Sequence, residues 1–371
     1  MAVLNRLDFP SDTVTTIIMQ GWNDPYMVAY AHANGIRVLQ AVGCEAYNLK
    51  ANTSWCSKLA DPVFFAQQVS AYNESMRQGT LDGFGWDVEE IDPAFQPDVA
   101  RFIGATKAAY PELFHCFYVG NLVATGWMSW QAAPIKAIGA VVDLVIVSAY
   151  TETNDTAAAG PGKTMCSRPC PTSSLPTVDG ALHGTPLPNG TRAHDSWATI
   201  VPKEKLVLAL GWFHQQWLAN MTENTPHHAW PWSGPYELGR RISFCQAISL
   251  YTSLGDDREE RRHWDPGSNS WWFNCEHDAA DPATFQGCGP WSNASQPVTT
   301  QIWYDDHVSS DSKLAAVKQA GWKGVGFWQA SGMWPGGTSY YDVYDNTTNI
   351  AVYCKREILE LWSVTSQYFG S

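Results

Sequence analysis

The sequence lacks the signals that mark several common classes of protein. The first ten residues contain no apolar core of a secretory leader, and no run of about 18 apolar residues marks a membrane span. The C-terminal Tyr-Phe-Gly-Ser is no lipid-anchor signal. Basic residues are scarce, because 23 Lys and Arg stand against 36 Asp and Glu and give a net charge of -13. This acidity argues against nucleic acid or an anionic membrane as the main partner.

Patterns for metal and phosphate binding are also missing. Cys166 and Cys170 lie close together in Pro-rich sequence without a matching Cys/His pair, which favours a local disulfide over a metal site. His227 and His228 are adjacent but have no carboxylate or cysteine near them. The stretch 157–164 resembles a phosphate loop, yet it lacks the first glycine and no helix follows. We therefore expect no metal and no cofactor.

Cysteine, tryptophan and glycosylation sequons are all abundant. Nine cysteines favour an oxidising compartment over the cytosol. Cys116 and Cys245 fall inside predicted elements and are interpreted as buried thiols, whereas Cys275 and Cys288 bracket a loop and are a candidate pair. Asn-x-Ser/Thr sequons occur at seven positions: Asn52, Asn73, Asn154, Asn189, Asn220, Asn293 and Asn346. Together these features predict a secreted or lysosomal glycoprotein. The 19 tryptophans suit either a core or sugar-stacking surfaces.

Short apolar runs alternate with segments of helical periodicity along the chain. Strands are predicted at Val14–Met19, Ile36–Val42, Leu81–Glu89, Leu113–Val119, Leu144–Tyr150, Leu206–Leu210 and Gly324–Trp328. Helices are predicted at Pro25–Asn34, Pro62–Gln78, Pro97–Ala109, Ala132–Val141, Leu238–Ser253 and Ser310–Ala320. This pattern predicts an α/β fold, a (β/α)₈ barrel, in preference to a doubly wound sheet. We expect one domain over 1–371 with a loop insertion at about 153–197.

Only seven such strands are found, one fewer than a complete barrel has. We hypothesise that the sequence is an N-terminally truncated fragment, which would also account for the missing leader. A barrel without one strand exposes two unpaired edges, which favour aggregation.

The predicted strand Leu81–Glu89 carries acidic residues on one face. Side chains alternate along a strand, so one face carries Gly83, Gly85, Asp87 and Glu89. Phe84, Trp86 and Val88 share the other face, which suits a cover of helices. The carboxyl ends of parallel barrel strands form the catalytic face of such enzymes. Asp87 and Glu89 are therefore candidate catalytic residues, although a strand that ends in a solvated acidic turn is the alternative.

This stretch resembles the Asp-Gly-x-Asp-x-Asp-x-Glu signature of family 18 glycoside hydrolases. Asp82, Gly83, Asp87 and Glu89 match it, whereas Gly85 stands where the family usually has aspartate. In the family this strand is the fourth of the barrel, whereas only two predicted strands precede it here, so the resemblance implies that the first strand is absent from this sequence. Within the family, the segments 30–38, 301–306 and 324–328 are most similar to the chitobiases.

The resemblance implies a role for each matching residue. Glu89 would be the acid that protonates the leaving oxygen, and Asp87 would orient the substrate's N-acetyl group, whose oxygen is the nucleophile in this family. Tyr150 resembles a family tyrosine that hydrogen-bonds this group, while Thr151 stands where the family usually has aspartate. Trp328 resembles the family's tryptophan that forms the bottom of the sugar-binding subsite.

Further sugar contacts are predicted at Trp212, just beyond its strand, and at the motif residues Asp82 and Gly85. The implied partner is an oligosaccharide that contains β-1,4-linked N-acetylglucosamine, and we expect a monomer. Three readings remain: a chitobiase-like glycosidase, an endo-acting chitinase, and a chitinase-like lectin that has lost turnover. The presence of both Asp87 and Glu89 favours an enzyme, while Gly85 and Thr151 keep the lectin as an alternative.

Overall fold

The computed structural model describes most of the chain. Its described residues are 10, 12–20, 25–43, 55–78, 81–88, 91–120, 130–150, 171–184, 196–219, 240–252, 254, 258–277, 298–328 and 348–370. Among these, no helix has both the length and the apolar character that crossing a membrane would require.

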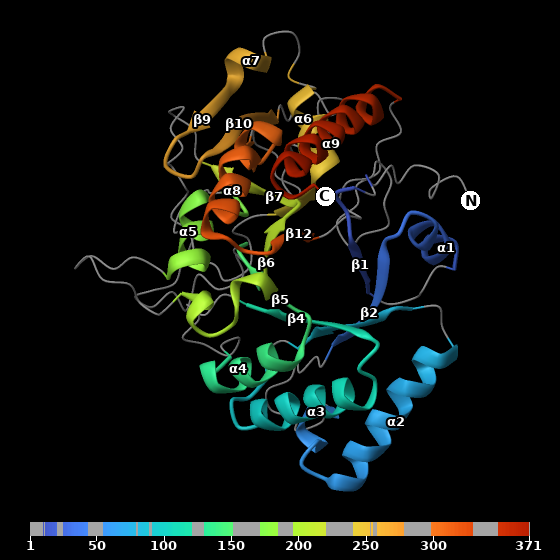
Figure 1. The fold of residues 1–371 in the computed structure, drawn as a ribbon. Helices are drawn as coiled ribbons and strands as arrows, with labels where there is room; N and C mark the ends of the chain where they lie inside the picture. Colours follow the sequence, from blue (N-terminus) through green and yellow to red (C-terminus); the bar gives the residue numbers. More distant parts are fainter. Residues whose placement is uncertain are drawn as a thin grey trace, which may run out of the picture.

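A parallel sheet of seven strands forms the centre of the molecule (Figure 1). In spatial order it contains β1 (Thr16–Met19), β2 (Arg37–Gly43), β3 (Gly83–Asp87), β4 (Phe114–Val119), β5 (Leu144–Ser148), β6 (Leu206–Gly211) and β12 (Gly324–Trp328). Within the described residues β1 and β12 are the two edges and do not pair with each other. The α/β fold is therefore confirmed as an incomplete barrel of seven strands.

Helices cover the outer face of this sheet. They are α1 (Pro25–Ala33), α2 (Pro62–Gln78), α3 (Gln96–Ala109), α4 (Ala132–Val141), α5 (Leu175–His183), α8 (His307–Ala320) and α9 (Thr348–Phe369). Figure 1 shows α2, α3 and α4 together on one side of the sheet. Phe84 and Trp86 of β3 are fully buried there and contact each other, and Trp86 packs edge-on against Phe102 of α3. Both point outward from the barrel, as their alternation predicts.

An antiparallel sheet of five strands, which the sequence patterns did not predict, lies between β6 and β12 in the chain. Its order is β8 (Arg240–Ser243), β7 (Phe213–Ala219), β11 (Val298–Tyr304), β10 (Ser270–His277) and β9 (Arg262–Asp265). The helix expected over Leu238–Ser253 is strand β8 followed by α6 (Phe244–Thr252), and a short α7 (Arg258–Arg261) precedes β9. Since β7 begins two residues after β6 ends, this sheet starts from the carboxyl edge of the barrel.

A disulfide joins α6 to the C-terminal helix α9, which was also not predicted. Cys245 bonds Cys354 across 109 residues of sequence, so the interpretation of Cys245 as a free thiol was wrong. Helix propensity and local pattern do not reveal a partner so distant in the chain. Cys116 is free and buried, as expected. Cys275 is disulfide-bonded, and Cys288, Cys166 and Cys170 lie outside the described residues.

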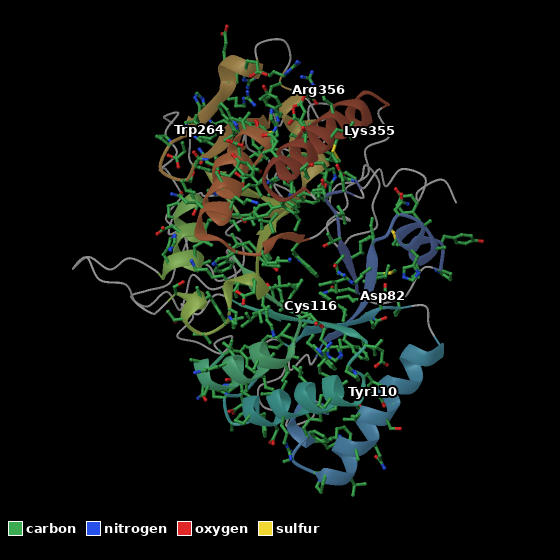
Figure 2. All side chains as sticks on the ribbon, in the orientation of Figure 1. Asp82, Tyr110, Cys116, Trp264, Lys355 and Arg356 are labelled. Carbon is green, nitrogen blue, oxygen red and sulfur yellow. A yellow bond between two sulfur atoms is a disulfide. The ribbon has the colours of Figure 1, made fainter. Side chains whose placement is uncertain are left out.

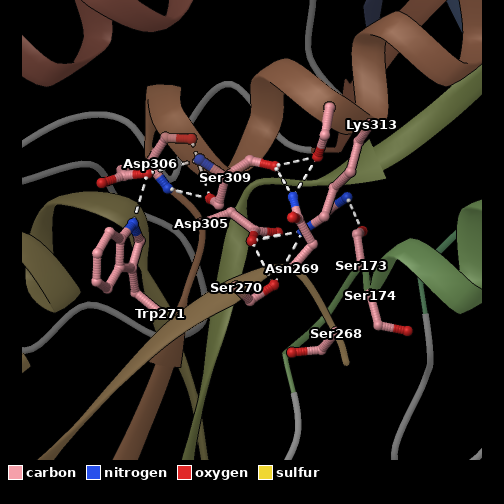
Figure 3. A network of polar contacts seen from close by, with 12 residues as sticks. Ser173, Ser174, Ser268, Asn269, Ser270, Trp271, Asp305, Asp306, Ser309 and Lys313 are labelled. Carbon is pink, nitrogen blue, oxygen red and sulfur yellow. Dashed lines mark hydrogen bonds and ion pairs between the residues drawn. The ribbon is translucent and has the colours of Figure 1, made fainter. Parts of the chain in front are cut away.

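A buried polar network ties α8 to the antiparallel sheet (Figure 3). Lys313 is 1 % exposed, and its Nζ lies 2.6 Å from Asp305 Oδ1 and 3.0 Å from Ser270 Oγ. Asp306 caps the N-terminus of α8 by accepting from the Ser309 backbone N–H, and it also accepts from Trp271 Nε1. Helix α8 thus holds the inserted sheet as well as the barrel strand that follows it.

Candidate active site

The carboxyl ends of the parallel strands bring the candidate residues to one edge of the sheet. In register, Asp87 lies opposite Gly43 of β2 and Tyr118 of β4. Trp328 lies opposite Gly211 at the other end of the sheet. Because facing pairs in a parallel sheet point the same way, these positions share the inner surface.

Asp87 is the last residue of β3, is partly buried, and receives a hydrogen bond from another strand. Gln20, which directly follows β1, donates from Nε2 to Asp87 Oδ2 over 2.9 Å. The sequence reasoning did not single out Gln20. The alternation of side chains along β1 could have identified it. Ile17 and Met19 pack against a buried apolar cluster on one face. Thr16, Ile18 and Gln20 therefore fall on the other face.

Two tyrosines meet beside Asp87. The hydroxyl groups of Tyr118 and Tyr150 are 2.5 Å apart, and their rings stack at 6.5 Å. Tyr118 occupies the position next to Asp87 on the neighbouring strand, so the tyrosine pair and Asp87 belong to the same inner surface. Tyr118 was likewise missed, although it alternates with Phe114 and Cys116 in the inward register of β4.

Trp328 belongs to the same inner surface. It is partly buried and packs on a small cluster formed by Tyr150 and Ala209, together with Tyr118 and Ile146. The structure therefore brings together three of the residues picked from the sequence, namely Asp87, Tyr150 and Trp328.

Gly85 is the inward-facing residue that precedes Asp87 on β3, and the space that a side chain at this position would need is occupied. A Cβ atom built at Gly85 would lie 2.6 Å from Cγ2 of Ile18 in β1. A larger residue at position 85 therefore requires Ile18 to move. In this chain the position contributes space for Ile18 and no side chain of its own.

Asp82, which is labelled in Figure 2, directly precedes β3. It therefore lies at the opposite end of the strand from Asp87. Its Oδ2 accepts from the backbone N–H of Val38 at 2.7 Å and lies 2.9 Å from His32 Nε2. These contacts fasten the start of β3 to β2 and α1. The structure does not bring Asp82 to the carboxyl edge, so its expected substrate contact finds no support in its position.

Trp212 is also placed away from the inner surface. It is 4 % exposed and its ring stacks on Phe327 at 3.9 Å and meets Trp362 of α9 edge-on. Trp212 directly follows Gly211, which faces inward, so alternation turns Trp212 outward under α9. Its ring faces are used for packing, and it does not join the residues around Asp87.

Glu89 and Thr151 lie outside the described residues, so their roles remain as the sequence predicts them. The described part of the chain ends at Val88 on this strand, one residue before Glu89, and at Tyr150 after β5.

The buried ionisable groups near the sheet do not add a second reactive centre. Burial raises the pKa of the Cys116 thiol, and the charges of Asp143 and Asp87 raise it further, so this inward-facing cysteine stays protonated and unreactive. His115 faces the helical side. Its Nδ1 accepts from Trp86 Nε1 at 3.2 Å, and burial lowers its pKa to about 4.

One group in the described residues has the composition of a metal site: Asp306, His307 and Glu357. Asp306 is already engaged by Ser309, Trp271 and Arg262. His307 Nδ1 lies 3.0 Å from Glu357 and 3.2 Å from Glu360. These contacts join the start of α8 to α9, and the group is explained by that structural role.

Solved structures share this fold, although no family model matches the sequence and no curated protein matches it either. YKL-39, crystallised in the presence of chitooligosaccharides, has a TM-score of 0.64 and 11 % identity, covering 100 % of this chain and 94 % of its own. A chitinase from Chromobacterium violaceum gives 0.60 and 14 %, covering 100 % and 95 %. The spore cortex-lytic enzyme SleL of Bacillus megaterium gives 0.63 and 14 %, covering 97 % and 68 %. The chain therefore has the fold of chitinases and spore cortex-lytic enzymes.

Proposed function

We propose that the protein is a retaining glycoside hydrolase of family 18 that cleaves β-1,4-linked N-acetylglucosamine. The observation that carries the proposal is the position of Asp87. It ends β3 on the inner face at the carboxyl edge, beside the Tyr118–Tyr150 pair. This is the edge at which barrel enzymes of known mechanism hold their catalytic groups.

The proposed reaction uses the substrate's own N-acetyl group. Glu89 donates its proton to the glycosidic oxygen, and the bond from that oxygen to the anomeric carbon breaks. The acetamido oxygen bonds to the anomeric carbon from the opposite face. Water then attacks that carbon, gives its proton to the Glu89 carboxylate, and releases the acetamido oxygen. Two inversions leave the product with the configuration of the substrate.

The other site residues would assist the attacking group. An ionised Asp87 would accept the acetamido N–H and stabilise the positive charge that develops as its oxygen attacks. The Tyr150 hydroxyl, which is held by Tyr118, would position the same group. Trp328 would supply an apolar floor for the sugar ring, because aromatic faces suit the C–H faces of sugars.

Chain length of the substrate defines two versions of this function. The sequence resemblance favours the chitobiase type, which would act on the chitobiose core of N-glycans or on short chitin fragments. The second version is an endo-acting chitinase. The similarity in fold to the Chromobacterium violaceum chitinase supports it as an alternative to the chitobiase type.

A carbohydrate-binding protein without turnover is the second candidate function. Gly85 favours it, because a residue that the family uses beside the catalytic aspartate is replaced and its space is filled by Ile18. Asp87 and Glu89 favour the enzyme, because a lectin has no need of a proton donor.

We also propose a secreted or lysosomal location and a monomeric state. The Cys245–Cys354 disulfide and the sequons support an oxidising compartment. The proposed partner is a chitobiose-containing glycan, and we propose neither nucleic acid nor a membrane as a partner.

Incubation with chitobiose and longer chitooligosaccharides tests the proposed function, with Glu89→Gln as the paired variant. Removing the acid should abolish sugar release while leaving binding intact, since the amide keeps the shape of the side chain but cannot protonate the leaving oxygen. Binding by calorimetry serves as the control for folding. Release at the wild-type rate by Glu89→Gln would remove Glu89 from the acid role.

A further inference from the structure

Gly85, the inward residue that precedes Asp87 on β3, has no side chain that could hold Asp87. The signature that this strand resembles has an aspartate there. Ile18 of β1 fills the space, with Cγ2 only 2.6 Å from the position of a Cβ at Gly85. Support for Asp87 on this side must therefore come from a different strand.

Gln20 is the next inward residue of β1 beyond Ile18, and it reaches Asp87 across β2. Two strand spacings are about 10 Å, a gap that a Gln and an Asp side chain span together when nothing stands between them. The inward residues of β2 at this level are Ala41 and Gly43, which pair with Gly85 and Asp87. Their small size leaves the path open for the bond of 2.9 Å from Gln20 Nε2 to Asp87 Oδ2.

We propose that Gln20 is the positioning residue for Asp87 and takes the place of the side chain that Gly85 does not supply. The inference rests on the proposed hydrolytic function, in which Asp87 orients the N-acetyl group. An amide N–H bonded to a carboxylate oxygen favours the ionised form and restricts rotation of the carboxylate. Ile18 and Gln20 together make β1 the support of the catalytic strand.

A glutamine at position 20 in place of an aspartate at position 85 also changes how Asp87 titrates. Two neighbouring carboxylates disfavour double ionisation and share a proton, which couples their titrations. The Gln20 amide does not titrate, so its contact with Asp87 shares no proton. This contact should therefore add no second titration to the acid limb of the pH–rate profile.

The test compares Gln20→Met with Gln20→Glu in the full chain. Gln20→Met keeps the length of the side chain but removes the donor. We expect kcat for chitobiose to fall about tenfold, the effect of losing one hydrogen bond to a charged group, with KM nearly unchanged. Gln20→Glu should shift the acid limb to higher pH, because a second carboxylate raises the pKa of Asp87.

Gln40→Met is the matched control. Gln40 lies on β2, and its amide donates to the main-chain oxygens of Met19 and Ala41. The same change of side chain there should leave kcat unaltered. Thermal unfolding of all variants shows whether each one folds.

A titration of carbon-13-labelled aspartate carboxyls by NMR separates this proposal from the hydrolytic function, with Asp87→Asn to assign the signal. Gln20→Met should raise the pKa of Asp87 whether or not the protein turns over sugar. If the wild type does not cleave sugar but Gln20→Met shows this rise, the hydrolytic function is overturned and the role of Gln20 in positioning Asp87 is supported. An unchanged Asp87 pKa in Gln20→Met overturns the role of Gln20.

Discussion

At the scale of single residues, strand alternation explains which sequence-based assignments the structure supports. Asp87 and Trp328 were chosen from motifs, and both fall in the inward register. Trp212 was chosen because it follows its strand, yet Gly211 is the inward residue and Trp212 turns under α9. Applying the same alternation to every strand would have identified Gln20 and Tyr118 and excluded Trp212. The contact between Ile18 and Gly85 had no such signal, because it joins strands that are not neighbours.

The two tryptophans give a paired prediction. Trp328→Ala should weaken binding of chitooligosaccharides, because it removes the proposed floor of the subsite. Trp212→Ala should lower the free energy of unfolding by about 3–5 kcal/mol, the usual cost of emptying a buried aromatic site. Calorimetric binding and denaturant unfolding of both variants check this. A large loss of affinity in a stable Trp212→Ala protein would return that residue to the binding site.

At the scale of elements, the barrel strands could be predicted, whereas the inserted sheet could not. The parallel strands appear as short apolar runs bounded by turns, which is a local signal, and inner strands such as β3 and β6 are almost entirely buried. The strands β7 to β11 mix aromatic and polar residues. Although β9 and β10 form a hairpin, β7 and β11 pair across about 80 residues of sequence. Leu238–Ser253 illustrates the consequence, since its first part pairs with β7 as β8 and only the rest is helical.

Lys313 provides the test of how α8 holds this sheet. Lys313→Met removes a buried charge but leaves Asp305, which is 12 % exposed, with the Ser270 hydroxyl as its remaining bond. Breaking one side of a buried ion pair typically costs about 3–5 kcal/mol. Lys318→Met on the exposed face of the same helix is the control. Lys318 Nζ lies 5.5 Å from the centre of the Phe369 ring, and loss of this exposed contact should cost less than about 1 kcal/mol of unfolding free energy. Equal stabilities of the two variants would mean that the network contributes little.

At the scale of the whole molecule, a sheet of seven parallel strands, one fewer than a complete barrel has, was predicted from the count of apolar runs. The structure has seven parallel strands in the described residues, with β1 and β12 as edges. Placement of β3 does not depend on those edges, because β2 and β4 flank it on both sides. Only the support by Gln20 comes from an edge strand, so the site is coupled to the stability of β1.

Two buried histidines predict how the fold responds to acid. Burial lowers the pKa of His115 and of His214 from 6.5 to about 4. The unfolded chain therefore takes up protons first as the pH falls, so the free energy of unfolding should decrease between about pH 6.5 and 4. Each group contributes about 3 kcal/mol to this decrease. Stability at several pH values in this range measures it.

His214→Phe is the variant that checks the origin of this acid sensitivity. The His214 ring packs against Phe244 and Tyr304, and its Nε2 has no hydrogen-bond partner among the described residues, so phenylalanine fits the surroundings. As the pH falls through this range, the free energy of unfolding should decrease less in the variant than in the wild type. An equal decrease in both proteins would mean that His214 does not cause the acid sensitivity. Acid sensitivity of this size would also limit how acidic a compartment the protein can occupy.

The most direct test of the central claim is the anomeric form of the first product. Proton NMR of chitotetraose or chitobiose, recorded immediately after the wild-type protein is added, distinguishes the two anomers before they equilibrate. Attack by the substrate's own N-acetyl group predicts that the β-anomer appears first at the new reducing end. Initial release of the α-anomer, or tight binding with no release at all, would contradict the account.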